Sequence, residues 1–130
     1  PLIMGGKTKF QPVYVEDICK GIMEILKKNI TNKTFEFGGP DIFSFKELLK
    51  ILLRIINRKR ILVYIPKKIA VLMAKFFQLL PNPLLTEDQI KILENDNIIL
   101  NANYTLKYLG INPVSLELIL PDYLKRFKKY

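Results

Sequence analysis

Residues 10–26, FQPVYVEDICKGIMEIL, and residues 35–52, FEFGGPDIFSFKELLKIL, decide the fold of this chain. Each stretch starts with a short run that favours a strand and continues into apolar residues at helical spacing. The two stretches therefore predict strand, helix, strand, turn and helix, in that order. Such alternation is typical of α/β proteins.

The expected strands are short, and residues around them mark their ends. We expect one strand at residues 10–15, at a sheet edge because it contains a proline, and another at residues 34–37. Gly38, Gly39 and Pro40 follow the second strand and predict a sharp turn with positive backbone dihedral angles.

Polar residues mark where three helices should begin. Asp17 stands where the first helix needs an N-cap. Ser44 with Glu47, and Thr86 with Gln89, have the spacing of a capping box, in which the side chain and the backbone of each residue bond reciprocally. These signals predict helix starts near residues 17, 44 and 86.

The apolar residues predict which helix faces are buried. Cys19 lies beside Ile18, Ile22 and Ile25, so we expect it on a buried face in a structural role. A later helix is expected to bury a broad apolar stripe, consisting of Ile69, Leu72, Met73, Phe76, Phe77 and Leu80.

The remaining segments predict a loop, a strand and two more helices. Residues 1–8 contain two glycines and predict a loop, and residues 61–65 are β-branched and predict a strand. Pro66 fits the first turn of the helix that follows. A last amphipathic helix is expected from about Pro121.

The composition excludes several kinds of chemistry. Of 130 residues, 49% are hydrophobic, which suits a packed core and argues against disorder. The chain has no histidine, so Ser-His-Asp triads, Cys-His dyads and histidine metal sites are excluded. One cysteine allows no internal disulfide and favours a reducing compartment. No metal site is expected.

The net charge of +9 raises the question of an anionic partner. Five basic residues define the expected basic surface: Arg58, Lys59, Arg60, Lys67 and Lys68. Two readings stay open, since these cations either face solvent or dock on anionic lipid or a partner subunit. No nucleic acid is expected, because the lysines are scattered and no nucleic-acid-binding motif is present.

Several segments resemble one protein family. Residues 8–22 and 35–56 are similar to the last part of the sheet in extended and atypical short-chain dehydrogenase/reductases of the NAD(P)-binding Rossmann superfamily. Residues 63–77 and 83–100 resemble the atypical subgroup that contains the nucleotide-binding accessory subunit of respiratory complex I. Residues 108–127 resemble the way those proteins end.

The resemblance implies a carboxyl-terminal piece of a longer protein, here called the parent protein. Its fold would be α/β: the last sheet strand of a Rossmann-like short-chain dehydrogenase/reductase fold plus a mostly helical substrate-side lobe. We expect residues 1–130 to be a single partial domain. Residues 1–40 would end the Rossmann-like part, and residues 41–130 would form the small helical lobe.

The resemblance also implies that the cofactor site and the catalytic residues lie in another part of the parent protein. The parent protein would bind NAD or NADP, but this chain alone has no glycine-rich dinucleotide loop and is expected to bind neither. We expect the family's catalytic Tyr-x-x-x-Lys pair to be absent, since neither Tyr104 with Lys107 nor Tyr14 with Lys20 has that spacing. No catalytic and no cofactor-binding residue is therefore expected here.

The candidates for a substrate cleft are Lys9, Gln11 and Tyr14, because the resemblance places their strand beside the cleft. Sugar-nucleotide epimerases carry Arg-Asp at the place of Phe10 and Gln11, and the Arg grips a nucleotide phosphate. Phe10 cannot do so, which argues against a sugar-nucleotide substrate.

Three hypotheses about function stay open. In the first, the parent protein is a complex I accessory subunit with a role in the respiratory complex or in quinone-related metabolism. In the second, it is an active NAD(P)-dependent epimerase or reductase; in the third, a non-catalytic basic module docks on a membrane or a partner subunit. The expected partners are the amino-terminal Rossmann portion, respiratory complex subunits or an anionic membrane surface. The expected location is cytoplasmic, peripheral at a bacterial inner membrane, or on the mitochondrial matrix side.

Overall fold

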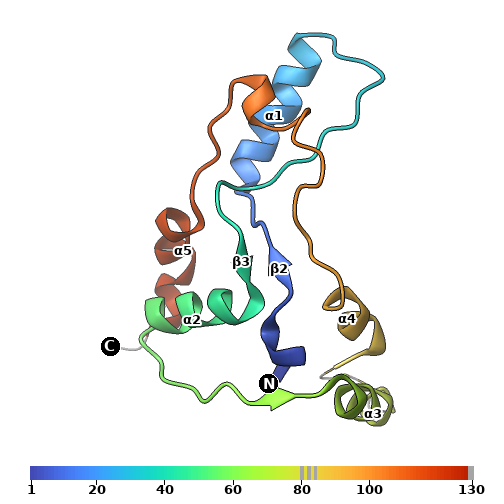
Figure 1. Cartoon of the computed structure of the whole chain (residues 1–130). Coiled ribbons are helices and arrows are strands. Elements are labelled where there is room, and N and C mark those ends of the chain that lie inside the picture. Colours follow the sequence, from blue (N-terminus) through green and yellow to red (C-terminus); the bar gives the residue numbers. More distant parts are fainter. Residues whose placement is uncertain (80, 82, 84, 129–130) are drawn as a thin grey trace.

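The structure is a computed structural model that describes residues 1–79, 81, 83 and 85–128. Figure 1 shows helix α1 (Val15–Lys27) at one end of the molecule and α2 (Phe45–Ile55), α3 (Lys67–Phe77) and α4 (Glu87–Ile92) at the other. The architecture is α/β and mostly helical, with small sheets, and it matches the carboxyl-terminal part of a Rossmann-like short-chain dehydrogenase/reductase fold.

The first sheet pairs two strands that lie far apart in the sequence. β1 (Leu2–Ile3) is parallel to β4 (Tyr64–Ile65). The expectation of a loop at residues 1–8 is therefore wrong at its start, because both residues of β1 are buried against β4 and α3. β4 is shorter than the expected strand at residues 61–65, and Ile61 is 91% exposed.

The second sheet lies in the middle of the molecule (Figure 1). β2 (Lys9–Phe10) is antiparallel to β3 (Phe43–Ser44), so of the strand expected at residues 10–15 only Phe10 is paired in the sheet. Residues 34–37 form no strand. Their backbone instead reaches the segment near Tyr104, where the amide of Glu36 donates to a carbonyl at 3.0 Å.

The start of α1 differs from the expectation. Tyr14 is the N-cap, and Asp17 lies inside the first turn with a relative exposure of only 1%. The Asp17 carboxylate accepts from the amide of Val114 at 2.7 Å and from the ammonium of Lys20 at 3.2 Å. Asp17 is therefore a buried clamp between α1 and the segment before α5, and the predicted N-cap is wrong.

The apolar face of α1 is largely uncovered. Cys19, Ile22 and Leu26 are exposed, and Leu26 has a relative exposure of 64%. The prediction of a buried Cys19 is wrong, because no described segment packs over that side of the helix. Ile18 and Ile25 are half-buried.

Both predicted capping boxes are present. At the start of α2, the Ser44 hydroxyl accepts from the amide of Glu47 at 3.2 Å, and the Glu47 carboxylate accepts from the amide of Ser44 at 2.7 Å. These bonds hold the pKa of Glu47 below its ordinary value. Thr86 and Gln89 make the same reciprocal pair at the start of α4.

The core lies where α3 and α4 meet the first sheet. Ala70 and Ala74 on α3 pack with Ile3 of β1 and Ile90 of α4. The expected stripe of large residues is wrong as a buried face, since Ile69 and Leu72 are exposed and Phe76 is 68% exposed. Ala70 and Ala74 are buried because their small side chains allow α4 to pack close to α3. Leu80, the end of the expected stripe, lies outside the described residues.

The start of α3 and the turn after residue 37 also differ from expectation. Pro66 is the N-cap of α3, one position before its first turn. Gly38 and Gly39 do not have positive φ. Glycine is needed at residue 39 because another segment approaches closely. A Cβ on Gly39 would lie 1.9 Å from the carbonyl oxygen of Pro12.

The tail begins with a short 3-10 helix, η2 (Lys107–Leu109), which ends at Gly110 with a φ of 81°. Helix α5 (Leu116–Leu124) starts before the expected position and contains Pro121, and η3 (Lys125–Phe127) follows it. Figure 1 shows α5 lying beside α2.

Candidate functional site

Gln11 uses both polar atoms of its side chain within the chain. Its Nε2 donates to the carbonyl of Gly39 at 2.8 Å, and its Oε1 accepts from the amide of Ile99 at 3.0 Å. Its backbone amide donates to the carbonyl of Asn97 at 3.0 Å. Gln11 thus links three segments, and it lines a cleft of about 560 Å³ together with Gly39 and Tyr108.

Lys9 lies in β2 with an exposed side chain. Its backbone is held on both sides: the amide donates to a carboxylate oxygen of Asp96 at 2.8 Å, and the carbonyl accepts from the amide of Asn97 at 2.8 Å. The backbone contacts position this residue, and the side chain is free to reach a ligand on the surface.

Tyr14 occupies a different part of the surface. It lines a small, mostly apolar pocket of about 260 Å³ with Val114 and Tyr123, between the start of α1 and α5. A hydrogen bond to the Glu16 carboxylate raises the pKa of Tyr14 to about 12. The phenol is therefore protonated at neutral pH and can act as a donor.

The three cleft candidates do not line one common pocket. Gln11 lines the cleft beside the Gly38–Pro40 turn, Tyr14 lines the pocket beside α5, and the exposed Lys9 in β2 lines neither. Their joint role at a substrate cleft stays a prediction, with these two pockets as its alternative locations.

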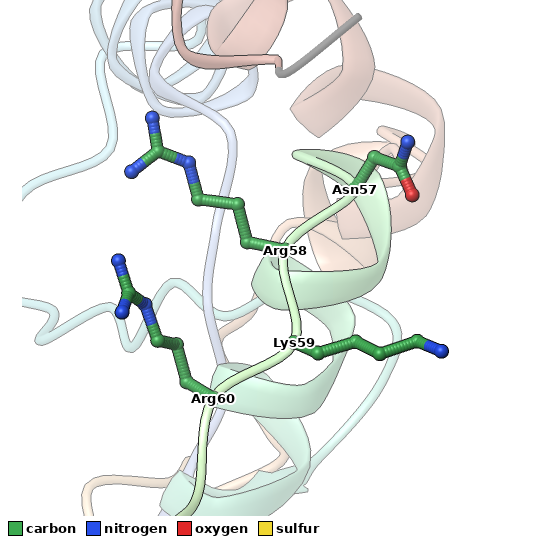
Figure 2. A pocket seen from close by; sticks show the side chains of 4 residues that line it. All are labelled: Asn57, Arg58, Lys59 and Arg60. Atoms are coloured by element: carbon green, nitrogen blue, oxygen red, sulfur yellow. The ribbon is translucent and has the colours of Figure 1, made fainter.

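The first basic cluster forms a turn directly after α2. Arg58, Lys59 and Arg60, called the basic turn below, line a shallow hollow of about 330 Å³ together with Asn57. Asn57 has a φ of 54°, which ends the helix. Figure 2 shows the guanidinium groups of Arg58 and Arg60 extending to the same side, whereas Lys59 extends to the other.

The second basic cluster lies elsewhere. Lys67 and Lys68 begin α3, and the Lys67 ammonium forms an ion pair with Glu94 at 2.9 Å. In Figure 1 the chain runs from the end of α2 across to β4 before it reaches α3, so the two clusters lie at opposite ends of that segment. The expected basic surface thus consists of two separate clusters.

The expectation that no Tyr-x-x-x-Lys spacing occurs is wrong, because Tyr64 and Lys68 have it. Residues four apart are neighbours on one helix face only when both belong to the same helix. Here Tyr64 is in β4, Lys68 is in α3, and the extended Pro66 separates them. The two residues therefore lack the shared helix face that a catalytic pair of this spacing needs.

The described helix starts do not fit a dinucleotide. Pyrophosphate binding needs a helix amino terminus with free amides after a glycine-rich turn. α1 carries Glu16 and Asp17 in its first turn, and α2 and α4 use their own side chains as caps. α3 follows a proline and α5 follows Ser115 with Glu117 in its first turn, so neither follows a glycine turn. No catalytic step through NAD or NADP is therefore assigned to these residues.

Two features are absent from residues 1–79, 81, 83 and 85–128. In that part of the chain, no cluster of three or more His, Cys, Asp or Glu side chains could hold a metal ion. Within the same residues, no helix combines the length and apolar character needed to cross a bilayer.

Comparison with known proteins gives relatives along nearly the whole chain, although no family model matches it. The Arabidopsis thaliana mitochondrial protein named NADH dehydrogenase (ubiquinone) 1 alpha subcomplex subunit 9 is 35% identical over 140 residues, covering 99% of this chain and 35% of that protein. The Rattus norvegicus protein of the same name is 32% identical, covering 100% of this chain and 35% of that protein.

A fungal relative and a solved structure extend this result. The mitochondrial NADH-ubiquinone oxidoreductase 40 kDa subunit of Neurospora crassa is 29% identical, covering 95% of this chain and 34% of that protein. The crystal structure of gox2253 matches with a TM-score of 0.60 at 17% identity, covering 94% of this chain and 39% of that chain, which shows a shared fold. The chain spans about a third of the length of these curated relatives.

Proposed function

We propose that the chain is the carboxyl-terminal lobe of an NAD(P)-binding, reductase-like protein that serves as an accessory subunit of a respiratory NADH dehydrogenase complex. One observation carries the proposal: the similarity to proteins named as subunits of that enzyme extends over 99% and 100% of this chain. Because those relatives are about three times longer, NAD or NADP would bind in their other part, on the parent protein's amino-terminal Rossmann portion.

Exposed apolar residues and a segment outside the sheets support the proposal that another domain packs against this lobe. The apolar residues Ile22 and Leu26 of α1 face solvent, and residues 34–37 belong to no strand. A strand of a parallel sheet is normally buried by helices on both faces. The Rossmann portion would cover α1 and pair with residues 34–37.

Within this proposal, residues 1–40 end the Rossmann-like part and residues 41–130 form the helical lobe. Lys9, Gln11 and Tyr14 would form part of the substrate-cleft wall and position ligands without taking part in catalysis. The protein would work on the matrix side of the mitochondrial inner membrane or at the equivalent face of a bacterial membrane.

The test uses the full-length protein in membranes of its source cells. After mild detergent extraction, native electrophoresis separates the complexes, and a stain for NADH oxidation locates the dehydrogenase. We expect the tagged protein to comigrate with that activity. An Ile22→Asp variant should be lost from the complex, because it places a charge in the face that the Rossmann portion covers, whereas a Lys27→Asp variant should be retained.

A different result would favour an independent enzyme. If the tagged protein migrates only as a small free species and the purified protein turns over NADH or NADPH with a substrate, the accessory-subunit proposal is wrong. Retention of Ile22→Asp and Lys27→Asp alike would contradict the proposed packing of α1.

A further inference from the structure

An apolar groove lies next to the basic turn. It has a volume of about 630 Å³, within the range of roughly 300–1,000 Å³ that is usual for small-molecule sites. It runs between α2, the segment after the basic turn, and α4. Its apolar walls include Leu49, Leu53, Ile61, Leu62, Ile92 and Leu93. Of the described residues that line it, only Arg60 has a charged side chain.

The basic turn is a run of three consecutive cations without an acidic partner among the described residues. Arg54 pairs with Glu117 at 2.8 Å and Lys67 pairs with Glu94 at 2.9 Å. Arg58, Lys59 and Arg60 form no ion pair with a described residue. Three consecutive cations thus repel one another without a compensating acid, an arrangement that an external anion would stabilise.

The orientation of the two arginines favours a phosphate. Their guanidinium groups extend to the same side of the chain (Figure 2), and a guanidinium offers planar, paired donors that match phosphate oxygens. Arg60 lines both the hollow of the basic turn and the apolar groove. The binding surface for an anion therefore continues directly into a binding surface for an apolar chain.

Exposed apolar residues beside the basic turn point to a lipid. Ile61 is 91% exposed and Val63 is 58% exposed, although both directly follow the cations in the sequence. Nucleic acid or free phosphate would use the cations alone and leave these side chains in water. A bilayer would cover them, and burial of apolar surface is favourable.

We propose that this face docks on an anionic bilayer, with the phosphate of an anionic phospholipid bound by Arg58 and Arg60 and an acyl chain of that lipid in the groove. The proposal deepens the proposed function and rests on it, since it says how an accessory subunit contacts its membrane. It differs from a general attraction of a basic protein to lipid, because it assigns the contact to one turn and one groove.

The first experiment measures binding of the 130-residue chain to vesicles by co-sedimentation. Vesicles of phosphatidylcholine with phosphatidylglycerol should bind the chain, and vesicles of phosphatidylcholine alone should not. An Arg58→Gln/Arg60→Gln variant should lose about 30-fold in partition coefficient, at about fivefold for each charge near an anionic surface. Lys67→Gln/Lys68→Gln is the matched control, which removes the same charge from the second cluster and should lose far less.

The second experiment locates the insertion. The chain has no tryptophan, so an Ile61→Trp variant carries a unique fluorescent reporter at a site too exposed to disturb folding. Vesicles with brominated acyl chains should quench its emission. A Leu26→Trp variant reports from α1, at the opposite end of the molecule in Figure 1, and should not be quenched.

The outcomes separate the proposal from its alternatives. Equal losses for the two charge variants, equal quenching of the two reporters, or no quenching would each overturn it. Inorganic phosphate that protects the chain from heating without any quenching by vesicles would indicate a free-anion site and also overturn it. Because these measurements use the chain alone, their failure is distinct from a failure to comigrate with the dehydrogenase.

Discussion

The two ends of the molecule hold together in different ways. At the α3–α4 end, Ile90 is 1% exposed and packs with Ile3 and two fully buried alanines. At the α1 end, the buried residues of the helix are Asp17 and Gly21, whereas Leu26 faces solvent. The α3–α4 end thus has an apolar core, although Leu72 and Phe76 stay exposed there. The α1 end combines the Asp17 clamp with the buried Leu106 and leaves Leu26 exposed.

The largest expected effect is at the apolar core. Ile90→Ala should lower the free energy of unfolding by about 2–5 kcal/mol, because it removes buried methyl groups and leaves a cavity. Urea denaturation followed by circular dichroism measures it. Ile92→Ala, on the exposed side of the same helix, is the control and should change stability by less than about 0.5 kcal/mol. Equal effects of the two variants would break the comparison.

The Asp17 clamp should matter less than the core but more than an exposed acid. Asp17→Ala removes the acceptor of the Val114 amide and should cost about 1–3 kcal/mol of the free energy of unfolding. Glu16→Ala, in the same helical turn but exposed, should have a small effect. Hydrogen exchange should show faster opening near Val114 in the first variant alone. Indistinguishable variants would show that the α1 end is held by something else.

A helix cap tests a purely local contribution at the α3–α4 end. Thr86→Ala removes the hydroxyl that accepts from the amide of Gln89, and the free energy of unfolding should fall by about 1 kcal/mol. Thr86→Ser keeps that hydroxyl and should retain most of the stability. A thermal melt of the three chains decides this, and equal losses in both variants would point to packing of the methyl group.

The smallest expected effect is on the exposed face of α1, and it depends on context. Leu26→Ser should change the stability of this chain by less than about 0.5 kcal/mol, since the side chain is already in water. In the full-length protein the same substitution should cost about 2 kcal/mol, because a buried leucine loses its apolar contacts. Thermal melts of both proteins give the two values. A small effect in both would mean that no domain covers α1.

Local chemistry explains which features could be predicted from the sequence. The reciprocal bonds of Ser44 with Glu47 and of Thr86 with Gln89 span three residues, so nothing distant is needed to form them. The α/β class follows from the order of strand-like and helix-like runs. The positions of the basic residues could be read directly, but their separation into two clusters depends on the path of the chain through β4.

Other features depend on segments far apart in the sequence. Asp17 is of a residue type that favours N-caps, but its carboxylate instead accepts from the amide of Val114 and is buried. Leu2 is a strand residue because it pairs with Tyr64. A local sequence pattern does not predict such contacts between residues far apart in the chain.

The sequence by itself determined the capped starts of α2 and α4, the apolar share that makes a core possible, and the concentration of cations after α2. Only the tertiary structure decided which apolar residues are buried: Ala70 and Ala74 rather than Phe76 on α3, and neither Ile22 nor Leu26 on α1. It also decided that Arg60 borders an apolar groove. The physical reason is that helical period and capping act over a few residues, whereas burial depends on which distant surface packs against a face.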